Sequence, residues 1–286
     1  MGEKLTNLLT YDFRSTEKVN LLVYQNYGFG DMVQFLRYIP FLSDATAKLG
    51  LSIKGNFYEP WTEIAAEIPS FKWLIMSQYG SYLDDILIEG WNSVPSDYTH
   101  KIECMDLANI YPIISPDVWR IKDEKPKCTE QLSVGYCLAG SKGHPDDSYR
   151  SINKIYFDKF LNTFKDEINF VNLSQKELQS KYGCFCIQDT VKIIKSLDLI
   201  ISVDTLVAHL AGYCQIPVFL LHGKLFDKRW IPKESKHWYP LTKHVHWGNN
   251  DEWRTVINND LTQAFSAWKE NQIDSKTRNR ASYSRY

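Results

Sequence analysis

Short apolar runs alternate with stretches of helical periodicity along most of this chain, and no other feature limits its possible folds as strongly. We expect strands at residues 19–24, 51–54, 73–76, 86–88, 132–139, 168–173, 199–203 and 218–221. Helices are expected between them, at residues 31–39, 61–68, 156–164, 190–196, 205–213 and 252–269. Strands that alternate with helices build βαβ units around a mostly parallel sheet, so the sequence predicts an α/β fold.

The chain is long enough for two domains, since 44% of its 286 residues are apolar and can fill two cores. The alternation lapses at residues 116–130, where prolines and mixed charges form the expected linker. We predict an N-terminal domain at 1–115, a C-terminal domain at 131–251, a final helix at 252–270 and a disordered tail at 271–286. Ligands of such folds bind beyond the carboxyl ends of the strands, so we expect a site in a cleft between the domains.

Composition argues against several classes of partner. The 33 Lys and Arg nearly balance the 34 Asp and Glu, whereas a protein that binds duplex nucleic acid by charge carries a basic excess. No stretch approaches the roughly 18 apolar residues of a membrane span, and the first residues lack the apolar core of a signal peptide. The six cysteines form no C-x-x-C pair, so we expect free thiols and a cytoplasmic protein.

The first candidate site follows the opening strand, at Gly28-Phe-Gly30-Asp31. Two glycines allow a tight turn and bring backbone N–H groups close to a ligand. Asp31 begins a helix that Pro40 interrupts, and its carboxylate is either a general base for an acceptor hydroxyl or only a helix cap. Position 33 is Val, so the full G-x-G-x-x-G pattern of dinucleotide-binding enzymes is absent.

Two further polar segments follow strands of the second half. After the strand at 132–139, a loop carries Ser141, Lys142, Arg150 and Ser151. Arginine offers a planar fork of donors to phosphate oxygens, so this loop is either a diphosphate site or a solvated surface.

The third segment is Asp204-Thr205-Leu206, followed by His209, where the strand at 199–203 runs into a helix. The free N–H groups at the start of that helix favour an anion. Thr205 and His209 are four residues apart and share one helix face near this end. Asp204 either binds a sugar hydroxyl or caps the helix.

Several patterns that carry other chemistry are absent. There is no Asp-x-Asp triplet, no P-loop and no Gly-x-Ser-x-Gly elbow. Cys184-x-Cys186 and His244-x-His246 lack the partner motifs of a zinc site. We therefore expect no metal site and no cofactor.

Three ordered segments now show a resemblance to a known family. The residues Gly28-Phe-Gly-Asp-Met-Val-Gln34-Phe-Leu-Arg37-Tyr-Ile-Pro-Phe-Leu42 resemble a glycine–aspartate opening followed by "QFxRYxPLL". The segments 134–140 and 150–152 resemble "GLxWAG … RSI", and 201–212 resembles "ISVDTAVAHLAG". Together they resemble the heptosyltransferase-like glycosyltransferases (family 9), including the domains often found behind tetratricopeptide repeats.

The resemblance implies a GT-B fold of two Rossmann-like domains, and inverting, metal-independent transfer from a nucleotide-diphosphate sugar. It makes Asp31 the catalytic base and Arg150 the residue that neutralises the departing diphosphate. It implies that Thr205 and His209 bind the phosphates and that Asp204 contacts the donor. We expect the other donor-side residues at Gly28, Gly30, Ser141, Lys142, Ser151 and Leu206. Gln34 and Arg37 are placed on the acceptor side. The final helix at 252–270 is expected to cross back to the first domain.

Other readings stay open at this stage. Leu206, in a position where the family often has a small residue, and His222-Gly, in place of a common Phe-Gly-Pro turn, fit a nucleotide-sugar-binding or assembly module without catalysis. A GT-B sugar-nucleotide epimerase is a third reading. The acceptor is either an envelope saccharide or a hydroxyl on a protein or modified nucleic-acid base, for which the basic residues after 275 give only faint support. The sequence does not indicate the sugar or the oligomeric state.

Overall fold

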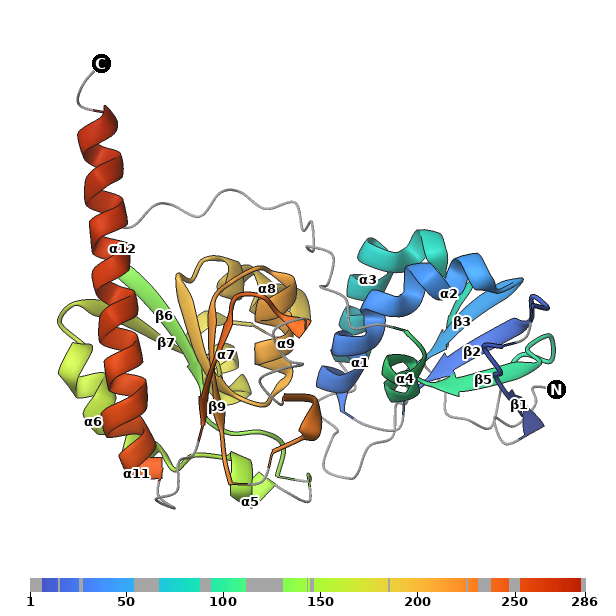
Figure 1. Ribbon diagram of the computed structural model, residues 1–286, viewed down its shortest axis with the longest axis horizontal. Helices are drawn as coiled ribbons and strands as arrows, with labels where there is room; N and C mark the ends of the chain where they lie inside the picture. Colours follow the sequence, from blue (N-terminus) through green and yellow to red (C-terminus); the bar gives the residue numbers. More distant parts are fainter. Residues whose placement is uncertain are drawn as a thin grey trace.

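The computed structural model describes residues 7–14, 16–25, 28–53, 67–87, 94–111, 131–142, 144, 147–184, 186–224, 226–230, 238–246 and 253–283. Within them, two five-stranded sheets lie side by side along the long axis of the molecule, each covered by helices (Figure 1). The strands on the two sides of the expected linker therefore form two separate sheets. The linker itself lies outside the described residues.

The first sheet has the strand order β1-β5-β2-β3-β4, and its neighbouring strands are parallel. Its strands are β1 (Leu9–Thr10), β2 (Asn20–Tyr24), β3 (Lys48–Ser52), β4 (Asp85–Leu87) and β5 (His100–Glu103). Its helices are α1 (Phe29–Phe35), α2 (Ile39–Ala45), α3 (Glu67–Tyr79) and α4 (Leu107–Ile110), with 3₁₀ turns at Leu36–Tyr38, Gly80–Tyr82 and Cys104–Asp106. The central β2 is apolar and buried on both faces, because Leu21 and Val23 pack in the cluster that contains the helices and Leu22 packs against Leu8, Val94 and Tyr98.

The second sheet has the order β10-β9-β8-β6-β7 and is also parallel. Its strands are β6 (Leu132–Cys137), β7 (Ile168–Asn172), β8 (Leu199–Val203), β9 (Val218–His222) and β10 (Thr242–His246). The helices are α5 (Asp147–Arg150), α6 (Lys154–Phe164), α7 (Gln175–Tyr182), α8 (Ile187–Lys195), α9 (Leu206–Tyr213), α11 (Trp253–Thr255) and α12 (Thr262–Tyr283). A 3₁₀ turn at Lys228–Trp230 and a π-helical segment at Val256–Leu261 complete the domain.

The expected strand at 73–76 is wrong, because these residues lie within α3. Leu74 and Ile75 are buried while Met76 is 47% exposed, so the apolar run is one face of a helix. A short apolar run looks the same in a strand and in a buried helix. The expected helix at 61–68 lies mostly outside the described residues, and only its last two positions fall in α3.

The helix that follows β2 is interrupted, as predicted from Pro40. A 3₁₀ turn at Leu36–Tyr38 separates α1 from α2, and Pro40 lies in the first turn of α2. Proline fits there because the first helical N–H groups have no partner within the helix.

The final helix lies on the second domain, away from the first (Figure 1). Phe265 is fully buried, with its ring centre 4.8 Å from that of Phe164 and 5.0 Å from that of Phe160. Lys269 Nζ also lies 2.6 Å from Glu167 Oε2. The expectation that this helix crosses back to the first domain is therefore wrong.

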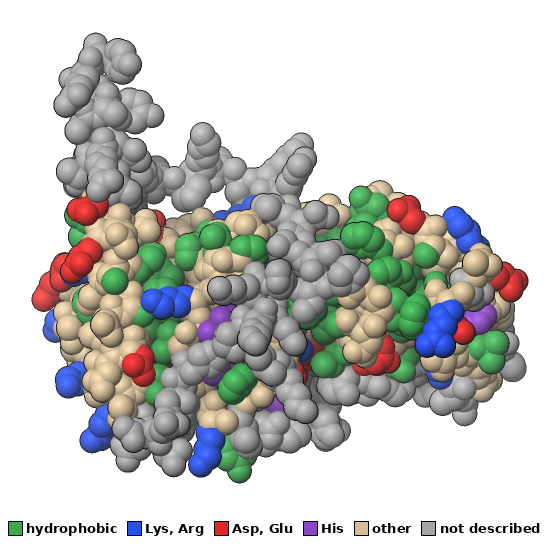
Figure 2. Space-filling model, viewed as in Figure 1, with side chains coloured by type: hydrophobic (Ala, Val, Ile, Leu, Met, Phe, Trp, Pro, Cys, Tyr) green, Lys and Arg blue, Asp and Glu red, His purple; other side chains and the backbone are tan. Residues whose placement is uncertain are grey.

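The expected disordered tail is also wrong over most of its length, because α12 continues to Tyr283. Its last turns contain no glycine or proline, and a helix already anchored by packing extends at little cost. No helix in the described part of the chain is both long and apolar enough to cross a bilayer. Basic and acidic side chains are scattered over the face shown in Figure 2 rather than gathered in a patch.

One apolar cluster continues from the first domain into the second. It joins residues of α1, α2 and α3 to residues of α8 and α9 and to Trp238. The rings of Phe35 and Trp238 meet edge to face, with their centres 5.7 Å apart. This shared core fixes the start of α1 against the start of α9.

Candidate functional site

The first turns of α1 and α9, which belong to different domains, are in contact. Gly28 and Thr205 are the extended N-cap residues of these two helices. A Cβ atom added to Gly30 would lie 3.0 Å from His209 Cδ2 and 3.4 Å from the Leu206 backbone N. Glycine at position 30 therefore allows the close approach, and two positively polarised helix ends face one small region.

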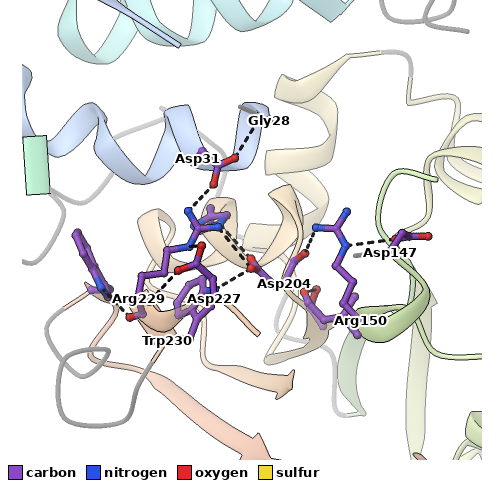
Figure 3. A network of polar contacts seen from close by, with 12 residues as sticks. Gly28, Asp31, Asp147, Arg150, Asp204, Asp227, Arg229 and Trp230 are labelled. Carbon is purple, nitrogen blue, oxygen red and sulfur yellow. Dashed lines mark hydrogen bonds and ion pairs between the residues drawn. The ribbon is translucent and has the colours of Figure 1, made fainter. Parts of the chain in front are cut away.

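Asp31 lies in this region, inside α1 rather than ahead of it. The helix begins at Phe29, two residues earlier than expected, so Asp31 is the third helical residue. Its Oδ2 accepts a hydrogen bond of 2.9 Å from the backbone N–H of Gly28. Its Oδ1 forms an ion pair with Nη1 of Arg229, a residue of the second domain (Figure 3). Both carboxylate oxygens are thus engaged.

Arg229 lies between carboxylates of both domains. Besides Asp31, its Nη2 lies 3.5 Å from Asp204 Oδ2 and its Nε lies 3.8 Å from Asp227 Oδ2. Burial alone would lower the pKa of Arg229, but the charges of Asp204, Asp31 and Asp227 raise it above the ordinary value. Its backbone oxygen accepts a hydrogen bond of 3.2 Å from Trp238 Nε1. The site therefore holds a permanent positive charge on an anchored backbone.

Asp204 ends β8 and is surrounded by donors. Trp230 Nε1 donates to its Oδ2 at 2.8 Å, and His209 Nε2 lies 3.5 Å from its Oδ1. Burial alone would raise the pKa of Asp204, but the charge of Arg229 and the bonds from His209 and Trp230 lower it below the ordinary value. Asp204 is consequently an ionised carboxylate at any working pH.

His209 is fully buried between Asp204 and Tyr239, whose hydroxyl lies 2.9 Å from its Nδ1. Burial lowers the pKa of His209, and contact with Asp204 opposes this only in part. The neutral ring satisfies both partners when Nε2–H points to Asp204 and Nδ1 accepts from Tyr239.

Replacing His209 by Gln is expected to make the free energy of unfolding decrease less when the pH is lowered. Below about pH 6.5 the unfolded chain binds a proton at this histidine while the folded chain does not. The contribution of the neutral His209 to the free energy of unfolding is therefore complete above about pH 6.5. It decreases as the pH falls from there toward the lowered pKa of the folded state, by up to about 1.4 kcal/mol per pH unit. Urea midpoints at pH 7 and 5.5 measure this difference, with exposed His144→Gln as the control. Equal losses in wild type and His209→Gln would contradict the assignment.

Arg150, at the end of α5, is joined to the same network through Asp204. Its Nη1 donates to the backbone oxygen of Asp204 at 3.1 Å, and its Nε lies 3.3 Å from Asp147 Oδ1. Ser151 Oγ donates to that same Asp147 oxygen at 2.7 Å. The guanidinium lies directly over Gly140, where an added Cβ would be 2.3 Å from Nη2.

The other predicted donor-side residues lie around this network. Thr205 Oγ1 is 3.1 Å from Ser202 Oγ and 3.7 Å from Cys137 Sγ. Leu206 is half-buried against the shared core. Ser141 and Lys142 are exposed on the loop after β6.

Gln34 and Arg37, which the sequence predicts on the acceptor side, are buried where the two domains meet. Gln34 is fully buried and Arg37 is 3% exposed. Arg37 donates to the backbone oxygens of Gln34 at 2.7 Å and Trp238 at 2.8 Å. Its guanidinium carbon lies 4.9 Å from the ring centres of Trp238 and Tyr239. Trp238 and Tyr239 of the second domain therefore cover the Arg37 side chain.

No protein-family model matches the chain, and no curated protein matches its sequence. Solved structures do match. TibC, an iron-containing dodecameric glycosyltransferase of enterotoxigenic E. coli, is 11% identical, with 87% of this chain and 67% of TibC covered at a TM-score of 0.52. A family 9 glycosyl transferase of Veillonella parvula is 10% identical, with 86% of this chain and 92% of the other covered at a TM-score of 0.50. The chain has the GT-B fold.

This likeness confirms, at the level of the fold, the resemblance found in the sequence. The network of Figure 3 spans the seam between the two GT-B domains, with Asp31 on the N-terminal side and Arg150, Asp204 and Arg229 on the C-terminal side. In the described part of the chain, no three His, Cys, Asp or Glu side chains are grouped so that they hold a metal ion.

Arg229 and Trp230 are among the site residues that sequence reasoning missed, together with Asp147, Asp227 and Tyr239. Arg229 and Trp230 lie in the 3₁₀ turn Lys228–Trp230 after β9, beyond the carboxyl end of a strand of the second GT-B sheet. The rule that ligands of such sheets lie beyond these strand ends indicates that position. No local pattern, however, marks Lys-Arg-Trp as part of a site.

Proposed function

We propose that this chain is an inverting, metal-independent glycosyltransferase that moves a sugar from a nucleotide-diphosphate donor to a hydroxyl acceptor. One observation carries the proposal. A carboxylate of one GT-B domain, Asp31, meets two arginines of the other, Arg229 directly and Arg150 through Asp204. This arrangement places a base on one domain and cations on the other. The base can take the proton of a hydroxyl while the cations stabilise a departing diphosphate.

The steps follow from these positions. Asp31 takes the proton of the acceptor hydroxyl as its oxygen forms a bond to the anomeric carbon of the sugar. The bond from that carbon to the diphosphate oxygen breaks on the opposite side, and the electron pair leaves with the diphosphate. Arg150 and the N–H groups at the start of α9 compensate the charge of this leaving group. Attack from the opposite side inverts the anomeric centre.

Other observations support parts of the proposal. TibC and the Veillonella protein are named glycosyltransferases, and both share this fold. Two guanidinium groups supply positive charge of the kind that a divalent ion supplies in metal-dependent transferases. The described cysteines are free thiols, which supports the cytoplasm as the compartment.

Titration with nucleotide sugars tests the function directly. The full chain is titrated by calorimetry with ADP-, UDP-, GDP- and dTDP-sugars and then incubated with saccharide, protein and nucleic-acid acceptors. We expect binding of one nucleotide class and acceptor-dependent release of the nucleoside diphosphate. Arg150→Gln is expected to weaken donor binding by about 10- to 100-fold, since it loses hydrogen bonds from a charged group.

Lys154→Gln, at an exposed position of α6, is the control and keeps wild-type affinity. The absence of binding by wild type, or equal binding by wild type and Arg150→Gln, would contradict the donor site. Donor binding without turnover would favour a binding module instead. Conversion of the donor without an acceptor would favour an epimerase.

A further inference from the structure

The guanidinium of Arg229 covers the carboxylate to which the proposed reaction assigns the proton. Asp31 Oδ1 is paired with Arg229, and Oδ2 accepts from Gly28. The Asp31 side chain is only 17% exposed and that of Arg229 only 14%. An acceptor hydroxyl that binds Asp31 must therefore compete with Arg229 or Gly28 for a carboxylate oxygen.

We propose that Arg229 is a catalytic residue that changes partner, from Asp31 to the diphosphate of the donor, when the donor binds. The inference rests on the proposed function and deepens it. It makes binding ordered: the donor draws Arg229 away, and only then is Asp31 open to the acceptor.

The contacts of Arg229 suit such an exchange. Its backbone is held by the hydrogen bond from Trp238, and the next residue, Trp230, is held by its bond to Asp204. The guanidinium contacts to Asp204 and Asp227, at 3.5 and 3.8 Å, are longer than an ordinary charged hydrogen bond. The backbone is therefore fixed, while only the contact with Asp31 is close.

The balance of charge gives the reason for the move. Asp31, Asp204 and Asp227 already place three carboxylates around one guanidinium. A diphosphate bound at the start of α9 adds further negative charge beside Asp204, and a cation must approach it. Arg150, to which the proposed reaction already assigns the leaving group, contacts Asp147 and the Asp204 backbone. Arg229 is a second cation beside Asp204, and it is placed to respond to the added charge.

A double-mutant cycle tests this exchange without any turnover. The probes are ADP, UDP and GDP, titrated by calorimetry into the full chain. Asp31→Asn is expected to tighten binding of the preferred nucleoside diphosphate by about 3- to 10-fold, because Arg229 no longer has to leave a carboxylate. Arg229→Gln is expected to weaken binding at least tenfold, and Arg229→Lys to restore most of it. In the double variant Asp31→Asn/Arg229→Gln the tightening should disappear.

The outcomes separate this inference from the proposed function. If wild type binds none of the probes, the proposed function fails and the inference fails with it. If wild type binds but Asp31→Asn leaves the affinity unchanged, only the partner exchange is wrong. If Asp31→Asn increased the affinity equally in the wild-type and Arg229→Gln backgrounds, the partner exchange would also be wrong, since Asp31 would then affect binding without Arg229. Asp31→Asn changes one atom, so this arm decides the matter even if Arg229→Gln fails to fold.

Discussion

Replacing Asp31 by Asn is expected to lower the rate constant of sugar transfer by about 10²- to 10⁴-fold, the usual contribution of a general base. An amide has nearly the same shape and still accepts the hydrogen bond from Gly28, so the start of α1 keeps its structure. It does not accept the proton of a hydroxyl. Single-turnover transfer at saturating donor measures the loss, and calorimetry shows that the donor still binds.

Asp44→Asn is the matched control for this experiment. Asp44 is a carboxylate of the same domain, exposed on α2, and its replacement should leave the transfer rate within twofold of wild type. Transfer by Asp31→Asn at the wild-type rate would show that another group takes the proton. The base would then have to be sought elsewhere in the described seam or in residues outside it.

Arg37→Ala is expected to have the largest effect on folding, with a loss of about 3–5 kcal/mol in the free energy of unfolding. The change removes two hydrogen bonds from a charged donor, each worth about 1.5–3 kcal/mol, and leaves the carbonyl oxygens of Gln34 and Trp238 short of a donor. It also removes the buried contacts with the rings of Trp238 and Tyr239. These contributions are not independent, so their sum is an upper bound.

Urea unfolding followed by tryptophan fluorescence measures the loss as a lower midpoint. Arg14→Ala serves as the control, because Arg14 also lies over a ring, that of Phe13, but is exposed. Its replacement should change stability by no more than about 0.5 kcal/mol. If Arg37→Ala unfolded within 1 kcal/mol of wild type, Arg37 would not hold the domains together and its burial would have another reason.

The strands β6, β7, β8 and β9 of the second sheet were predictable because each is a largely apolar run with a clear end. The strand at 199–203 is found at the expected residues, bounded by Asp198 and Asp204. The run at 73–76 was misassigned because four apolar residues do not distinguish a strand from a buried helix face. The short β1 and the edge strand β10 carry too few apolar residues to be recognised.

The site could be predicted from the sequence only in part. Asp31, Arg150, Asp204 and His209 follow strands and begin or precede helices, and that local pattern places them at one edge of their sheets. Arg229 escaped prediction because its position depends on how the two domains pack, which the periodicity of either domain does not encode. The burial of Gln34 and Arg37 was not predictable for the same reason, since residues of the second domain contact them.

The apolar cluster shared by α1 and α9 also limits how the molecule moves. A wide hinge opening would expose Phe35 and Trp238 to water at a cost of about 25 cal/mol for each Å² of apolar surface. Small sliding of packed helices, with side chains that change rotamer, avoids most of this cost. We therefore expect the domains to move by shear and local side-chain rearrangement, and scattering profiles with and without nucleotide should show nearly the same radius of gyration.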